Sequence, residues 1–266
     1  MDRRTRRYSK LEAPIVYSFN IYCGFPKKIW RASITSFQKE AFENGEQASQ
    51  HFRWYTPPVN CIEIIYAEPV QLGVIGGTGF YSIRAFTYVA ELNPETPWGY
   101  PSSPITIARS PKGTPVAFLA RHGRGHIFSP TEVPSRANIA ALKHIGVRAI
   151  VAFSAVGSLQ QHIRPRDFLV PNQIIDRTRG LRPGTFFEKG LVGHAMFADP
   201  FDVAMEKMVI KASSALQDGS ELHSRETNGG QDVVLVCIEG PCFSTRAESN
   251  MYRGLGGHVV NMYAPT

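Results

Sequence analysis

The sequence predicts an α/β fold, a central sheet flanked by helices, from three observations. After residue 70, short runs rich in β-branched residues recur, Gly-rich turns separate them, and stretches with helical spacing lie between them. With 266 residues, of which 43% are hydrophobic, the chain is long enough to bury a large core. We expect one domain over residues 70–266. Residues 1–69 are an atypical N-terminal extension without sustained periodicity, and disorder is one interpretation of it.

The expected strands follow one another along this domain. Each is a short apolar run that ends at a turn. They cover residues 72–75, 105–108, 116–120, 149–154, 168–170, 233–238 and 259–262.

Three helices are expected between these strands. Residues 135–145 carry apolar side chains at helical spacing, and a second helix is expected over residues 201–216. A third covers residues 245–253, where Thr245 and Glu248 have the spacing of a capping box.

Composition excludes several classes of function. The net charge is +7, but no aromatic-flanked basic stripe is present, so we do not expect nucleic-acid binding. No apolar run approaches the roughly 20 residues of a membrane helix. The four cysteines lack disulfide or zinc spacing, and the start lacks a secretory signal. We expect a cytoplasmic protein without a metal site; the Arg-rich start leaves a mitochondrial transit peptide as an alternative.

Two motifs suited to anion binding follow expected strands. The Gly-rich turn at residues 76–79 lets backbone N–H groups approach an anion, and Thr78 adds a hydroxyl. A tight turn without a ligand is the alternative, and the spacing is not that of a dinucleotide site. Arg121 and His122 follow the strand at 116–120, where a planar guanidinium suits phosphate or carboxylate. Solvation of these side chains at the surface is the alternative.

Two further loops lie at strand ends, where ligands gather in open α/β sheets. Small residues at 154–158 would let a ligand lie against the backbone, although an ordinary turn explains them equally well. In the loop at 239–248, Phe243 could stack on an aromatic base.

Six motifs together resemble 5′-methylthioadenosine phosphorylases, of the trimeric class of the purine nucleoside phosphorylase superfamily. They are GVIGGTG, RHGRGHIFSP, SAVGSL, PNQIIDRT, IEGPCFSTRAES and VVNM, in that order over residues 71–262. The resemblance covers roughly three quarters of this chain and about the first two thirds of a family domain. It implies a partial nucleoside phosphorylase domain with a mixed sheet, incomplete at its C-terminus.

The resemblance also implies an activity. Such enzymes convert S-methyl-5′-thioadenosine and phosphate to adenine and 5-methylthioribose 1-phosphate, in methionine and purine salvage. They act as homotrimers in the cytoplasm, with the nucleus as a second location, and phosphate is a co-substrate beside which no cofactor is needed. Nucleosides of 6-oxopurines are the alternative substrates. Ser244 disfavours them, because relatives that act on them carry a Glu at this position.

Individual site residues follow from the same resemblance. The phosphate-binding positions are Thr78, Arg121, His122, Ser154 and Ala155. On the nucleoside side, Phe243 matches the residue that stacks on the base, with Ser244 beside it, and Met262 matches the residue under the ribose. His194 resembles a residue that reaches the 5′-thiomethyl group in the neighbouring subunit.

The chain departs from the family pattern at three places. Tyr263 replaces a small hydroxyl residue that would contact phosphate, and Val156 stands where a Cys or another small residue is usual. The aspartates that serve the leaving adenine are expected beyond Thr266, as are the last helices. The alternative function is therefore a catalytically inactive scaffold that at most binds nucleoside or phosphate.

Overall fold

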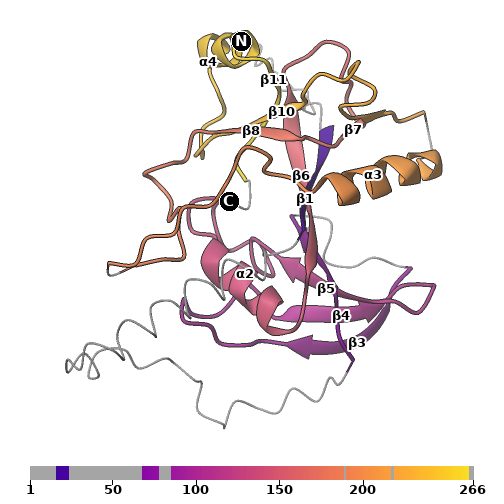
Figure 1. The fold of residues 1–266 in the computed structure, drawn as a ribbon, viewed down its shortest axis with the longest axis vertical. Helices are drawn as coiled ribbons and strands as arrows, with labels where there is room; N and C mark the ends of the chain where they lie inside the picture. Colours follow the sequence, from indigo (N-terminus) through magenta and orange to yellow (C-terminus); the bar gives the residue numbers. More distant parts are fainter. Residues whose placement is uncertain (1–15, 24–67, 78–84, 189, 217–218, 264–266) are drawn as a thin grey trace, which may run out of the picture.

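A computed structural model describes residues 16–23, 68–77, 85–188, 190–216 and 219–263 of the chain. The described strands form one mixed sheet (Figure 1). Its main path runs in the order β3 (Thr87–Leu92), β4 (Ile105–Arg109), β5 (Pro115–Ala120), β2 (Leu72–Gly76), β6 (Ala149–Ser158), β1 (Val16–Cys23), β7 (Phe168–Leu169) and β9 (Leu222–His223). A branch adds β11 (Gly257–Asn261), β10 (Val234–Cys237) and β8 (Gln173–Asp176).

Strand β6 connects the two parts of the sheet. Its first half pairs in parallel with β2, and its last residues, Gly157 and Ser158, pair antiparallel with β11. In Figure 1 it runs between the β3–β5 region below and the β8, β10 and β11 region above. The predicted α/β class and the mixed sheet are therefore both confirmed.

Strands β2 and β5 place the most informative sequence motifs side by side. They pair in parallel, from Leu72 opposite Val116 to Gly76 opposite Ala120. Both are largely buried, which explains why they are continuous apolar runs without polar alternation. Because parallel strands end at the same edge, the residues that follow them, Gly77 and Arg121, leave the sheet as neighbours.

The three predicted helices are present. They are α2 (Ser135–His144), α3 (Val203–Lys211), which continues as a 3₁₀ turn at Ala212–Ala215, and α4 (Arg246–Gly254). The predicted capping box of α4 is confirmed, because Thr245 and Glu248 bond each other's backbone N–H groups. None of the helices in the described ranges has the length and apolar character needed to cross a bilayer.

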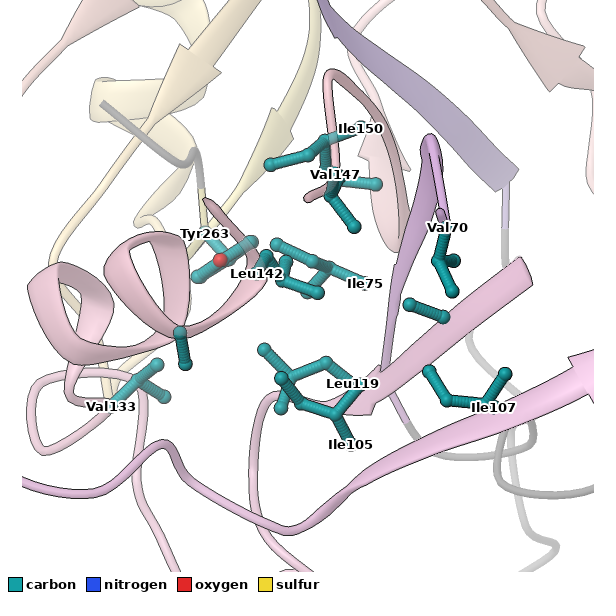
Figure 2. Close-up of a cluster of buried hydrophobic side chains, with 13 residues drawn as sticks. Val70, Ile75, Ile105, Ile107, Leu119, Val133, Leu142, Val147, Ile150 and Tyr263 are labelled. Carbon is teal, nitrogen blue, oxygen red and sulfur yellow. The ribbon is translucent and has the colours of Figure 1, made fainter. Parts of the chain in front are cut away.

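The largest hydrophobic cluster lies between α2 and the β2–β5 part of the sheet (Figure 2). Leu142 of α2 packs there with Ile75 of β2 and Leu119 of β5. Full burial of such a side chain contributes about 1.5–3 kcal/mol. Tyr263, from the segment after β11, reaches into the same cluster (Figure 2). The core therefore supports the strand ends that carry Gly77 and Arg121.

Four described strands, β1, β3, β8 and β9, were not predicted from the sequence. Strand β1 is the most unexpected, because it lies within residues 1–69. It pairs antiparallel with β6, from Val16 opposite Val156 to Cys23 opposite Ala149, and parallel with β7. The proposed domain boundary at residues 69 and 70 stays a prediction, since residues 1–15 and 24–67 lie outside the described ranges.

Candidate active site

Arg121 is held firmly at the edge where β2 and β5 end. Its backbone N–H donates to Gly76 O at 3.1 Å, and the residue is only 5% exposed. In its guanidinium, Nη1 donates to Phe153 O at 2.6 Å and Nε donates to His122 Nε2 at 3.1 Å. Nη2 lies 3.5 Å from Ser154 Oγ. Three segments of the sheet thus orient one cation.

Two more residues enclose this guanidinium. A Cβ atom at Gly77 would lie 2.6 Å from Arg121 Nη2, so any side chain there would displace the cation. The ring centroid of Tyr263 lies 4.4 Å from Arg121 Cζ, a cation–π contact. We call Arg121, His122, Ser154 and Tyr263 the Arg121 cluster.

Hydrogen bonds determine which nitrogen of His122 carries the proton. Nδ1 lies 2.9 Å from Phe128 O, and because a carbonyl only accepts, Nδ1 must be the donor. Nε2 is then the acceptor for Arg121 Nε. Burial lowers the pKa of His122, and the Arg121 charge lowers it further, although the Phe128 hydrogen bond opposes both. A neutral His122 therefore orients Arg121 and leaves neither ring nitrogen available for direct phosphate contact in this arrangement.

The Tyr263 hydroxyl does not neutralise Arg121. Burial raises the pKa of this phenol to about 12, with the Arg121 charge opposing the shift, so the hydroxyl stays protonated at ordinary pH. Its oxygen is buried and has no hydrogen-bond partner among the described residues. The Tyr263 ring therefore lies beside the Arg121 guanidinium as a neutral phenol.

The five predicted phosphate-binding positions can be compared with this geometry. Arg121, His122 and Ser154 lie together, and Ala155 follows Ser154 on β6 with its side chain exposed. Ser154 is buried, and its hydroxyl donates to Ala155 O at 3.2 Å. Thr78 lies just outside the described residues, next to Gly77. All five assignments stay predictions.

The second group of predicted residues lies in residues 239–245, which we call the Phe243 loop. A Cβ atom at Gly240, whose φ is +79°, would lie 2.6 Å from Met262 Sδ, so Met262 packs directly against this loop. Phe243 is 88% exposed, which leaves its ring free to stack on a ligand. The Ser244 hydroxyl is buried without a hydrogen-bond partner in the described part of the chain.

Sequence reasoning assigned no role to two residues, Arg182, which lies beside this loop, and Glu239, with which the loop begins. The Arg182 guanidinium donates to Met262 O and to Glu239 O, each at 2.9 Å. Its Nε lies 2.8 Å from Glu239 Oε2 as an ion pair. Glu239 belongs to one of the six motifs, so the sequence offered a signal for it. Arg182 belongs to none, and no local pattern distinguishes it.

His194 is not linked to either group by a hydrogen bond or an ion pair among the described residues. It is exposed in the segment 190–199. Several large apolar side chains of the same segment are also exposed, including Val192 and Met196. The predicted role of His194 in a neighbouring subunit stays a prediction.

The described residues gather no metal-ligand set, that is, no group of three or more His, Cys, Asp or Glu side chains suited to a metal ion. The Arg121 cluster instead offers a buried guanidinium beside hydroxyl and backbone groups. Such an arrangement suits an oxyanion such as phosphate.

Comparisons with known proteins agree with this chemistry. The family model of the phosphorylase superfamily matches residues 71–263. The S-methyl-5′-thioadenosine phosphorylase of Yarrowia lipolytica is 60% identical over 201 residues, which are 75% of this chain and 62% of that protein. The chain thus spans less than two thirds of the length of this curated relative.

Two solved structures extend the comparison. A methylthioadenosine phosphorylase from an antarctic soil metagenomic library has a TM-score of 0.67 and 41% identity, covering 74% of this chain and 66% of that one. A mutant adenosine/methylthioadenosine phosphorylase from Schistosoma mansoni, in complex with methylthioadenosine, has a TM-score of 0.64 and 33% identity. That match covers 74% of this chain and 73% of the other.

Proposed function

The chain belongs to the phosphorylase superfamily, and from that membership we propose that it acts in the phosphorolysis of S-methyl-5′-thioadenosine. The products would be adenine and 5-methylthioribose 1-phosphate. The observation that carries the proposal is the Arg121 cluster, a buried guanidinium fixed at the ends of parallel strands. The 60% identity to the Yarrowia lipolytica enzyme supports this choice of nucleoside.

In this reaction a phosphate oxygen forms a bond to the anomeric carbon while the bond from that carbon to the purine nitrogen breaks. The electron pair leaves with the purine, which then takes up a proton. Arg121 would hold the phosphate, because a preoriented cation lowers the cost of placing an anion beside the sugar. The 3.5 Å distance from Nη2 to Ser154 Oγ marks a weak hydrogen bond. A charge-assisted bond to phosphate would readily replace it.

The Phe243 loop would bind the nucleoside in this proposal. The exposed ring of Phe243 would stack on the purine, and Met262, packed against Gly240, would lie under the ribose. No described residue is assigned as proton donor to the leaving purine. The homotrimer, the role of His194 within it and a cytoplasmic location are parts of the same proposal.

The test is adenine release by the purified chain from S-methyl-5′-thioadenosine, followed by chromatography with and without phosphate. We expect adenine and 5-methylthioribose 1-phosphate in equal amounts, and only when phosphate is present. Release that does not depend on phosphate would refute phosphorolysis. Faster release from inosine than from S-methyl-5′-thioadenosine would favour the 6-oxopurine alternative over the assignment based on Ser244.

A second candidate function is binding of nucleoside or phosphate without turnover. The position of Tyr263 favours it, because the phenol ring covers part of the guanidinium that would hold phosphate. Calorimetric titration of the sample used for the adenine assay separates the two functions. Heat of binding without adenine release would support the scaffold, whereas heat with release would support the enzyme.

A further inference from the structure

Arg182 connects two segments that the proposed function assigns to the nucleoside. Its side chain is 14% exposed and that of Glu239 is 20% exposed, so the ion pair between them is mostly shielded from water. The two carbonyl groups that Arg182 binds belong to Glu239, at the start of the Phe243 loop, and to Met262. One guanidinium therefore binds both nucleoside segments.

The acceptors lie where β10 and β11 end. These strands are parallel, and their pairing ends where Cys237 lies opposite Asn261. The two carbonyl groups that Arg182 binds come after these last paired residues, outside the hydrogen bonding between the two strands. A planar guanidinium presents donors in a rigid fork, which can bind two fixed carbonyl groups at once. A lysine ammonium has no such fork. Arg182 thus bonds the start of the Phe243 loop and Met262 at the same time.

Glu239 extends this connection toward the Arg121 cluster. Its Oε1 atom accepts a hydrogen bond from Thr131 Oγ1 at 2.6 Å, while Oε2 faces Arg182. Thr131 lies in the segment 121–134, which also contains Phe128, the acceptor for His122. Arg182, Glu239 and Thr131 therefore connect the Phe243 loop and Met262 to the segment 121–134, which begins at Arg121.

We propose that Arg182 is a positioning residue for the nucleoside: it holds the Phe243 loop and Met262 at a fixed separation and, through Glu239 and Thr131, ties them to the segment of Arg121. This inference rests on the proposed function for its ligand, but not for its structural part. Without Arg182, the carboxylate of Glu239 would remain partly buried without its cation, and the loop would lose both carbonyl contacts.

The structural part is tested by hydrogen–deuterium exchange on the full chain without ligand. We expect Arg182→Gln to speed exchange at residues 239–245 and around Met262. The exchange rates of β2 and β5 should stay the same as in the wild type. Arg179→Gln is the matched control, because Arg179 lies in the same segment but is 74% exposed, with a distant ion pair to Asp176. Equal exchange in the two variants would overturn the proposal.

The ligand part is tested by calorimetry with S-methyl-5′-thioadenosine and, separately, inorganic phosphate. We expect Arg182→Gln to weaken nucleoside binding about tenfold and phosphate binding less than twofold. Arg182→Lys, which keeps the charge beside Glu239, should fall between Arg182→Gln and wild type. Equal weakening for both ligands, or recovery of wild-type affinity in Arg182→Lys, would contradict a specific role for the guanidinium fork.

Thr131→Val tests the link between the two halves. We expect this variant to bind each ligand alone as the wild type does, but to lose any increase in nucleoside affinity that phosphate produces. An unchanged increase would remove Thr131 from the link. If the wild type binds neither ligand, the proposed function fails, and the exchange experiment alone decides whether Arg182 holds the loop.

Discussion

The Arg121 cluster and the Phe243 loop are held in opposite ways. Arg121 and Tyr263 are 5% and 3% exposed, and Tyr263 belongs to the main hydrophobic cluster, whereas Phe243 is 88% exposed. The cluster is fixed by strand ends, but the loop is fixed by hydrogen bonds from Arg182 and by the cap of α4. A group that binds an anion must be oriented before the anion arrives, because reorientation would consume binding energy. A stacking ring can stay open until a base covers it.

The largest effect should come from Arg121→Ala, which removes the central side chain of the Arg121 cluster. We expect phosphate affinity to fall about 100-fold, because a preoriented charged donor is lost from a site shielded from water. Phosphate titration by calorimetry measures this change. Arg124→Ala is the control, since Arg124 is exposed and pairs with Glu91. Unchanged phosphate affinity in Arg121→Ala would exclude Arg121 from the site.

Acid should lower the free energy of unfolding through Asp167, which belongs neither to the Arg121 cluster nor to the Phe243 loop. Burial alone would raise the pKa of Asp167. Its carboxylate, however, accepts hydrogen bonds from the His223 ring, from the backbone and side chain of Arg164 and from the backbone N–H of Glu221, and together these outweigh the effect of burial. They lower the pKa to about 2, against an ordinary value of 3.8. The carboxylate therefore adds stability that is complete above about pH 4 and is lost as pH falls toward 2.

Urea unfolding between pH 2 and 7 measures this acid effect, which should amount to about 2 kcal/mol for Asp167. Asp167→Asn removes the titrating group, so the variant should lose that share of the pH dependence. The same loss of stability on acidification in wild type and variant would show that other carboxyl groups cause it.

Phe243→Ala tests the Phe243 loop, the exposed part of the candidate site. We expect nucleoside affinity to fall about tenfold, because stacking of an aromatic ring on a base contributes about 1–3 kcal/mol. The free energy of unfolding should change by less than about 0.5 kcal/mol, since the side chain is exposed. Leu255→Ala, at the exposed end of α4, is the control. A large loss of stability in Phe243→Ala would show that the loop is packed and that the comparison is wrong.

The smallest effect should come from Tyr263→Phe. This change removes a buried hydroxyl without a described partner and keeps the ring over Arg121. We expect the free energy of unfolding to rise by about 1 kcal/mol and phosphate affinity to stay within twofold of wild type. Thermal and urea unfolding measure the first quantity. A loss of stability would mean that the hydroxyl makes an essential hydrogen bond.

The sequence predicted those parts of the molecule that depend on neighbouring residues. The apolar runs of β2 and β5 and the capping box at Thr245 are local signals, and they are confirmed. The loop expected at residues 154–158 was wrong, because β6 continues to Ser158 and carries Ser154 within the strand. Ser154 still lies beside Arg121, since Arg121 Nη2 is 3.5 Å from Ser154 Oγ.

The rest depends on contacts between residues far apart in the sequence. The run VYSFNIYC at residues 16–23 is rich in β-forming residues, but its pairing with β6, more than 120 residues later, is a contact that no local pattern indicates. Arg182 binds carbonyl groups that are 57 and 80 residues away along the chain. Tyr263 was expected to take the place of a phosphate contact. Its packing among core residues of α2 and β2 could not be derived, because those neighbours are brought together only by the fold.

The most direct test of the account is calorimetric titration of the purified chain with S-methyl-5′-thioadenosine, first without phosphate and then with it. If the Arg121 cluster and the Phe243 loop form one site, the nucleoside should bind in both cases and more tightly when phosphate is present. Nucleoside affinity that is the same with and without phosphate would contradict the claim that these two groups act together.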